Sequence, residues 1–285
     1  MLLGILVLLA CEEPDPELYV QMLKSRDRAE RLKAANRLLR FGDAVLPRLL
    51  EEAGSEYTRV RFEVAKLLGR MRDDRAVPVL IEALDDRSAN VAQAAAWSLG
   101  EIGASRAMPA LLQYTNDPSK GMRQQVIRSL GACYNDSVLS EIADSVYVEV
   151  VKALRDPTPK VRISALQGIR EFGYRGTSDQ VIRLSRDPSD KVRHVAVQAL
   201  GQIGAGVVPR SPGPATGRER DNIVEALVAA LDEPLQSIRT KAVRSLEMME
   251  ERRVVAALER LRQTGTAEDS TETSRVLEKL ARAPE

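Results

Sequence analysis

A segment of about 31 residues recurs along this chain of 285 residues, and this repetition restricts the possible folds more than any other feature. Six copies align without internal gaps, and each begins with an apolar anchor: Val60, Val91, Met122, Val161, Val192 and Ile238. The anchors lie 31 residues apart, except where insertions of 8 and 15 residues precede Val161 and Ile238. A fixed period of this length is typical of stacked repeats, each too small to bury a core alone. The repetition therefore argues against two separate globular domains.

Each copy contains the pattern of two helices. Apolar residues four, eight and eleven positions after the anchor, such as Val64, Leu68 and Met71, form one stripe along a helix, which we name helix A. Glycines nine or twelve positions after the anchor indicate close packing and the end of this helix. A second apolar run follows a short turn, as in residues 75–86 and 221–232, and predicts a helix B.

The sequence thus predicts an all-α fold, an α-solenoid of about seven two-helix repeats. The expected repeats span about 26–54, 55–85, 86–116, 117–155, 156–186, 187–231 and 232–263. The first is a fainter copy, and residues 264–285 are expected to form a C-terminal capping helix, over 271–282, and a tail. Residues 205–220 form a loop rich in Pro and Gly, expected to be flexible unless a partner orders it, and a tolerated insertion is favoured over a functional loop. The shorter insertion is expected to lengthen a helix B and to bring Tyr147 toward the surface of the B helices.

The repeated pattern, with its DPSxxVRxxAxxALGxIG core, resembles HEAT repeats, especially the short variety named after phycobilisome lyases. The resemblance covers about 26–263. It implies that the B helices line a concave surface, which is the default binding surface of such stacks.

An arginine follows the anchor in five of the six aligned copies: Arg61, Arg123, Arg162, Arg193 and Arg239. An aspartate precedes three of these arginines by six residues, at Asp117, Asp156 and Asp187. We interpret the two columns as a structural ladder in which each arginine meets its own aspartate or that of the neighbouring repeat, as the resemblance also implies. Exposed ion pairs of this kind contribute only about 0 to 1 kcal/mol each. The alternative is a basic stripe for an anionic partner.

The composition and the surface positions favour a protein or peptide partner. Lys and Arg number 42 against 41 Asp and Glu, so the net charge of +1 gives no general attraction to nucleic acid. Trp97 lies opposite the apolar stripe of its helix A and suits a contact hot spot, unless the N-terminal tether or a loop covers it. The other candidate contacts are polar or aromatic residues on the B helices: Arg48, Glu51, Glu82, Gln113, Tyr114, Tyr147, Arg183 and Glu225. A solvated surface without a partner is the alternative.

No strong catalytic signature is present. The chain has one His and two Cys, too few for the common zinc motifs, and it lacks nucleotide-binding and hydrolase motifs. His194 stands in a variable column, and Cys133 replaces an apolar residue in a core column. We therefore predict no metal, no cofactor, no catalytic residue and no enzymatic activity.

The N-terminal residues predict an export signal. Residues 2–10 are all apolar, too few to span a bilayer but suited to a signal peptide. Leu8-Leu9-Ala10-Cys11 resembles the lipobox of bacterial lipoproteins, which implies a signal peptide over 1–10 and a lipid on Cys11, although no basic residue precedes Lys24. Residues 11–25 are then an acidic tether. The alternative is a buried apolar N-terminal segment.

Together these features favour a membrane-tethered scaffold at the bacterial cell envelope, lipid-anchored on the periplasmic or extracytoplasmic side, that binds another protein. An enzyme or enzyme subunit related to bilin lyases, which attach chromophores, is the main alternative. A DNA-binding HEAT-like protein is a weaker one.

Overall fold

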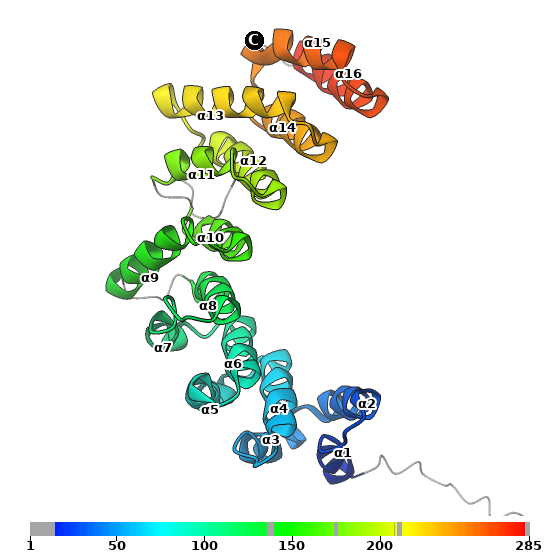
Figure 1. The fold of residues 1–285 in the computed structure, drawn as a ribbon, viewed down its shortest axis with the longest axis vertical. Coiled ribbons are helices and arrows are strands. Elements are labelled where there is room, and N and C mark those ends of the chain that lie inside the picture. The colour runs from blue at the N-terminus through cyan, green and yellow to red at the C-terminus, as the bar shows by residue number, and fades with distance from the viewer. Residues whose placement is uncertain (1–14, 136–139, 174–175, 208, 210–212, 283–285) are drawn as a thin grey trace, which may run out of the picture. The chain divides into compact units, whose positions relative to one another are not determined.

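The computed structural model describes residues 15–135, 140–173, 176–207, 209 and 213–282, and all regular elements within them are helices (Figure 1). The prediction of an all-α solenoid fold is therefore confirmed. The signal peptide and Cys11 lie outside the described residues. Contacts divide the chain into two compact units, 1–102 and 103–285.

In unit 1 the helices alternate between the expected A and B types. The A helices are α2 (Arg28–Leu38), α4 (Thr58–Met71) and α6 (Ala89–Ile102), and the B helices are α3 (Leu46–Glu52) and α5 (Val77–Glu82). Short 3-10 turns connect or extend them: η1 (Leu39–Ala44), η2 (Asp74–Ala76) and η3 (Ala83–Asp85). An additional helix, α1 (Pro16–Met22), precedes them.

Unit 2 continues the alternation. Its A helices are α8 (Lys120–Cys133), α10 (Pro159–Glu171), α12 (Asp190–Ala205) and α14 (Gln236–Met248). Its B helices are α7 (Met108–Leu112), α9 (Ser140–Ala153), α11 (Ser178–Leu184), α13 (Gly217–Ala229) and α15 (Val255–Thr264). The 3-10 turns are η4 (Ser105–Ala107), η5 (Ala230–Asp232) and η6 (Arg252–Val254), and α16 (Ala267–Arg282) follows α15. The expected repeat 86–116 is thus divided, because α6 ends unit 1 and α7 belongs to unit 2.

The expected tether over 11–25 is wrong from Asp15 onward. The Asp15 side chain caps α1 by accepting a hydrogen bond from the Glu17 N–H, and Pro16 occupies the first turn, where its missing N–H costs nothing. Tyr19, Val20 and Leu23 are buried. Since α1 packs on α2, it takes the place of a helix B.

The C-terminal helix begins earlier than expected, at Ala267 rather than at residue 271. The Thr266 N–H donates to the Asp269 carboxylate at 2.9 Å, and the Asp269 N–H approaches the Thr266 hydroxyl oxygen at 3.2 Å. This reciprocal capping starts the helix. Because α16 packs on α14 and α15, it takes the place of a helix A.

The two insertions have different outcomes. α9 runs for 14 residues, against 5 in α7, so the shorter insertion does lengthen a helix B. The loop expected over 205–220 is shorter, because α13 begins at Gly217. Its described C-terminal part folds back onto the end of α12, where the Ala215 N–H donates to the Gly204 carbonyl at 3.2 Å. Gly206 ends α12 with φ +69°, and a side chain there would overlap the backbone of Gly213 and Pro214.

Successive A helices approach one another through their smallest residues. A Cβ atom on Gly69 would lie 2.5 Å from the Ser98 hydroxyl oxygen, and one on Gly201 would lie 2.4 Å from the Ser245 Cβ. The Ser98 hydroxyl donates to the Ala65 carbonyl of the adjacent helix at 2.7 Å, so even its polar atom is satisfied. The glycine column therefore sets the distance between repeats.

Candidate functional site

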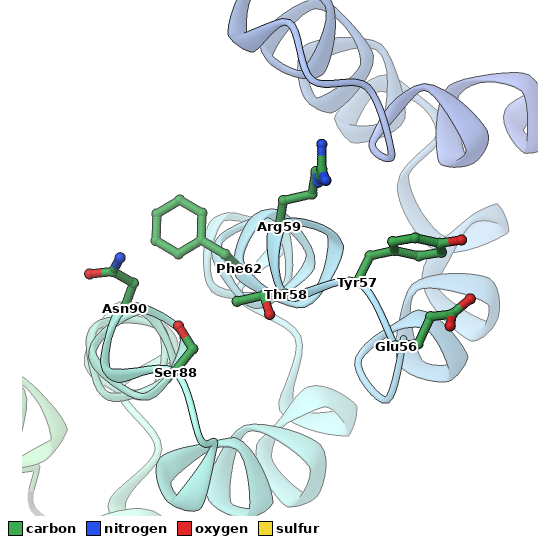
Figure 2. Close-up of a pocket in the computed structure, with 7 residues that line it drawn as sticks. All are labelled: Glu56, Tyr57, Thr58, Arg59, Phe62, Ser88 and Asn90. Atoms are coloured by element: carbon green, nitrogen blue, oxygen red, sulfur yellow. The ribbon is translucent and has the colours of Figure 1, made fainter.

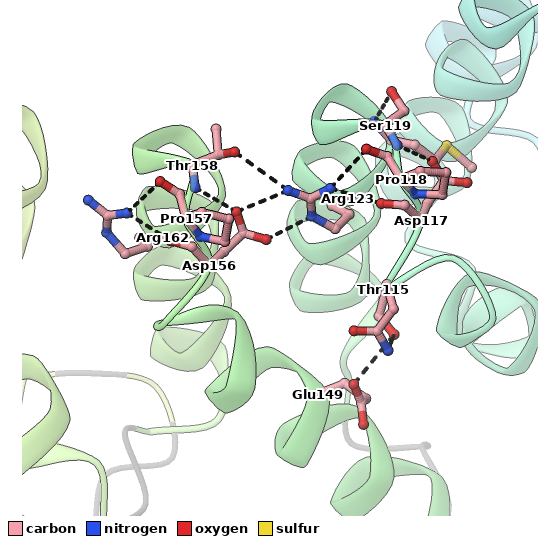
Figure 3. A network of polar contacts seen from close by, with 12 residues as sticks. Thr115, Asp117, Pro118, Ser119, Arg123, Glu149, Asp156, Pro157, Thr158 and Arg162 are labelled. Carbon is pink, nitrogen blue, oxygen red and sulfur yellow. Dashed lines mark hydrogen bonds and ion pairs between the residues drawn. The ribbon is translucent and has the colours of Figure 1, made fainter.

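The column of arginines forms a continuous set of contacts between neighbouring repeats within each unit, for which Arg123 is the clearest example (Figure 3). Its Nε and Nη2 donate to the two carboxylate oxygens of Asp156, at 2.7 and 3.2 Å. Its Nη1 donates to the carbonyl oxygens of Asp117 and Pro118, at 2.8 and 3.2 Å. Each arginine thus meets the carboxylate of the next repeat and the main chain of its own.

The other arginines in the column also pair with a carboxylate of the next repeat. Their closest donor–acceptor distances to the carboxylate of the next repeat are 2.6 Å for Arg61–Asp86, 2.6 Å for Arg162–Asp187, 3.1 Å for Arg193–Glu233 and 2.6 Å for Arg239–Asp269. The arginine side chains are at most 17% exposed, so they have little surface for an anionic partner.

Arg31 is a member of this column that the sequence analysis missed. Its Nη1 donates to the carbonyls of Ser25 and Arg26, six and five residues earlier, as in the other repeats. The preceding residue is Glu30, so the apolar anchor that would have identified the position is absent. Ser55 stands where the next repeat would supply a carboxylate, and Arg31 lies 3.5 Å from Glu63 instead.

Pairing shifts the ionisation of two of these pairs, Arg61–Asp86 and Arg123–Asp156, toward their charged forms. Hydrogen bonds from Arg61 lower the pKa of Asp86 against the opposing effect of burial, and the same bonds raise the pKa of Arg61. Burial alone would raise the pKa of Asp156, but hydrogen bonds from Arg123 and the Thr158 N–H outweigh it, so the pKa is lowered. These two contacts are therefore ion pairs at neutral pH.

Most of the candidate contacts on the B helices are exposed. This holds for Glu51, Glu82, Gln113, Arg183 and Glu225, whereas Tyr114 is half-buried in the turn after α7. Arg48 is engaged within unit 1, with ion pairs to Glu17, Glu51 and Glu52 at 3.0, 3.2 and 2.6 Å. Because Glu17 lies in α1, this arginine holds α1 against α3.

Two aromatic residues differ from expectation. Tyr147 packs with its ring centroid 5.6 Å from that of the buried Phe172, which also stacks on Tyr134 at 4.0 Å. Tyr147 therefore anchors the long α9 on the interior, instead of reaching out as predicted. Trp97 is half-buried rather than fully exposed, and its role as a contact residue stays a prediction.

A surface groove of about 550 Å³ lies between α7 and α9. Val148 is 48% exposed in it, although it is apolar and lies on a helix. The carboxylates of Asp144 and Glu149 lie beside this residue. The Thr115 hydroxyl, which donates to the Leu112 carbonyl at 2.9 Å, is also 3.4 Å from Glu149 (Figure 3). The lengthened helix thus adds an apolar surface with an acidic rim that the sequence analysis did not identify.

A second pocket, of about 490 Å³, lies at the N-terminal ends of α4 and α6 (Figure 2). Its lining residues are Glu56, Tyr57, Thr58, Arg59, Phe62, Ser88 and Asn90. Ammonium groups approach both rings: Lys24 lies 5.7 Å from the Tyr57 centroid and Lys66 lies 5.2 Å from that of Phe62. The sequence analysis missed this pocket because it compared the repeats for what they share.

Two side chains of reactive types, Cys133 and His194, have shifted pKa values. Burial raises the pKa of Cys133 to about 12, so its thiol is protonated at neutral pH. Burial and the nearby Lys241 lower the pKa of His194. Across the described chain, no group of three or more His, Cys, Asp or Glu side chains is placed to bind a metal ion. None of the described helices combines the length and hydrophobicity of a membrane-spanning segment.

Comparison with protein families gives two matches. HEAT repeats match residues 16–96, 77–150 and 147–212, and the PBS lyase HEAT-like repeat matches residues 192–233. No curated protein matches the sequence.

Solved structures share the fold at low sequence identity. An engineered protein is 19% identical with a TM-score of 0.56, over 95% of this chain and 79% of its own. The Escherichia coli protein YibA is 17% identical with a TM-score of 0.66, and the match covers 94% of this chain and 92% of YibA. A chain of the complex of CpcE and CpcF of phycocyanin lyase from Nostoc sp. PCC7120 is 20% identical with a TM-score of 0.51, and the match covers 98% of this chain and 100% of that one.

The prediction that the chain has no enzymatic activity is contradicted by two of these findings. One matching repeat takes its name from PBS lyase, and one similar structure is that of a phycocyanin lyase complex. The missing catalytic motifs misled the prediction, because a repeat protein can serve an enzyme without carrying a recognisable motif of its own.

Proposed function

Because the chain belongs to the HEAT-repeat family, we propose that it binds another protein through the exposed surface of its B helices. The groove between α7 and α9 carries this proposal. In this groove the apolar side chain of Val148 is 48% exposed, and acidic and amide groups lie around it, so the groove has the apolar centre and polar rim of a contact surface.

The groove also suggests what kind of segment binds there. Asp144 is exposed and forms no ion pair with any described residue, while Glu149 pairs with Lys152. A partner segment with an apolar side chain for Val148 and a Lys or Arg for Asp144 would complement both features. The exposed side chains on the other B helices are of mixed charge, which suits a protein surface better than a phosphate backbone.

We predict that replacing Val148 by aspartate weakens binding of the partner at least about tenfold, or about 1.4 kcal/mol. The partner is first identified with a photo-crosslinking amino acid at position 148, and its affinity is then measured with purified proteins. The matched control carries the photo-crosslinking amino acid at position 198 instead, in place of the exposed Gln198 of the A helix α12. Equal crosslinking from both positions, or unchanged affinity of the Val148→Asp variant, would contradict the proposal.

We also propose that a lipid on Cys11 holds the protein at a membrane, on the extracytoplasmic side of the bacterial envelope. The support is the apolar run of residues 2–10 followed by Cys11 and an acidic, Pro-containing stretch. One acyl chain binds a membrane only marginally, so stable anchoring requires more than one chain.

Replacing Cys11 by serine is therefore expected to abolish incorporation of a labelled fatty acid and to move the protein out of the membrane fraction. Both are measured after expression in a bacterial host that processes lipoproteins. Cys133→Ser is the matched control, since this buried cysteine should not affect labelling. Labelling that persists in the Cys11→Ser variant would exclude the anchor.

A second candidate is a lyase-related role, as a subunit of an enzyme that attaches a bilin to a protein. The match of residues 192–233 to the PBS lyase HEAT-like repeat favours it. The test supplies a bilin and the phycocyanin apoprotein to the purified chain, alone and with a second lyase subunit. A covalent adduct that depends on this chain would support the role, and its absence under both conditions would reject it.

A further inference from the structure

The pocket at the start of α4 and α6 is built from residues that depart from the repeat. Three residues before the anchor, four of the aligned copies carry Ser88, Ser119, Thr158 and Ser189 and the last carries Leu235, but Tyr57 occupies this position at α4. Two residues after the anchor, where Gln93 and Gln124 stand in the next two copies, α4 has Phe62. Stacking requires neither aromatic residue, because other repeats stack without them.

Both rings line the same pocket and are accessible. Tyr57 is 41% exposed, and Phe62 is half-buried. They lie on either side of Arg59 (Figure 2). The chain has only ten aromatic residues, six Tyr, three Phe and one Trp, so two accessible rings in one pocket are a notable share of them.

The charges around the pocket are mainly positive. Arg59 forms no ion pair with any described residue, and Lys24 and Lys66 lie over the two rings. Of the nearby carboxylates, Glu63 lies 3.5 Å from Arg31 and 3.8 Å from Lys66, and Glu56 is exposed at the edge. The pocket thus offers two apolar ring surfaces and a guanidinium that lacks a carboxylate.

We propose that this pocket binds an acidic peptide segment of a partner protein, with apolar side chains against Tyr57 and Phe62 and a carboxylate on Arg59. Aromatic rings and arginine are the residue types that contribute most to protein contacts. A carboxylate can accept two hydrogen bonds from one guanidinium, which fixes the orientation of the segment. A basic segment would face Arg59, Lys24 and Lys66 and be repelled.

This site is independent of the proposed B-helix surface, because none of its residues lines the groove between α7 and α9. A negative result for one site would therefore not contradict the proposal for the other. A Val148→Asp variant should keep the acidic-peptide site intact, and variants of the pocket should keep the groove intact.

The test measures fluorescence anisotropy with three labelled octapeptides, alternating Leu-Glu, Leu-Lys and Gly-Glu. We expect saturable binding of the Leu-Glu peptide, and binding at least about tenfold weaker for the other two. The double variant Tyr57→Ser/Phe62→Gln carries residues that other repeats have at these positions, so it should fold. It is expected to weaken Leu-Glu binding at least about tenfold, or about 1.4 kcal/mol.

Arg59→Gln should weaken Leu-Glu binding and reduce its dependence on salt. Arg260→Gln, at an exposed arginine of α15, is the matched control and should leave it unchanged. Circular dichroism confirms that each variant is folded. The proposal is overturned if the Leu-Glu peptide does not bind saturably, if the Leu-Lys peptide binds equally well, or if the folded double variant binds like the parent.

Discussion

Replacing Arg61 by methionine is expected to lower the free energy of unfolding by about 3 to 5 kcal/mol. Methionine keeps much of the apolar stem but removes the guanidinium, which leaves the Asp86 carboxylate, 10% exposed, without its cation. The carbonyls of Ser55 and Glu56 lose their donor in the same substitution. Urea unfolding followed by circular dichroism measures the change.

Two further variants distinguish the effect of losing the buried Arg61–Asp86 ion pair from the effect of losing any positive charge. Arg260→Met removes an exposed arginine whose partner Asp232 is 3.5 Å away and also exposed, so little change is expected. Arg61→Lys keeps the charge but loses the two-pronged contact with Asp86, and should fall between the parent and Arg61→Met. If Arg61→Met and Arg260→Met were equally stable relative to the parent, the column would have no special structural role.

Replacing Gly201 by valine is expected to cost about 3 kcal/mol or more, at the upper end of the range for overpacked cores. A Cβ atom at this position would lie 2.4 Å from the Ser245 Cβ and 2.8 Å from its Cα. The backbone cannot yield as the end of a flexible side chain would, so α12 and α14 must move apart. Thermal and urea unfolding of the purified variant measure the loss.

The control for this substitution is Gly54→Ala, since a Cβ atom on Gly54 would meet its nearest neighbour at an ordinary 3.8 Å. In a double-mutant cycle, Ser245→Gly should recover part of the stability that Gly201→Ala loses, because it removes the closest contact. Additive effects of these two substitutions would show that the approach of the helices is not what makes glycine necessary.

The helix pairs could be predicted well from the sequence, because the apolar pattern of each helix recurs in several repeats. An apolar stripe that appears once is ambiguous, but six aligned copies define the core positions and the helix ends together. The match of HEAT repeats to residues 16–212 confirms the family resemblance.

The helices at the two ends of the described residues were harder to predict, because they depart from the aligned pattern. α1 has the composition of a helix B, but its acidic, Pro-containing start was interpreted as a tether. In α16, Asp269 joins the column through a Thr-capped helix rather than an Asp-Pro pair. A repeat alignment cannot find an element that lacks the residues on which the alignment is based.

The candidate sites were predictable only in part. The exposed positions on the B helices follow from helical periodicity, but the groove beside Val148 depends on how α9 packs against α7. Tyr147 illustrates the difficulty, because periodicity alone does not reveal that its ring packs on Phe172. The pocket at Tyr57 and Phe62 was visible in the sequence as a departure from two columns, and comparing the repeats for their differences would have found it.

The contacts of the arginine column give the array a direction. Each arginine bonds to its own repeat through carbonyls and to the following repeat through a carboxylate, as Arg239 does with Glu233 and Asp269. A cut between two such repeats therefore leaves an unmatched cation on the N-terminal fragment and an unmatched anion on the C-terminal one. Duplication of a whole repeat adds one arginine and one carboxylate, and each of them finds a partner in a neighbouring repeat. An array with this polarity can therefore change in length while every contact between repeats keeps its ion pair.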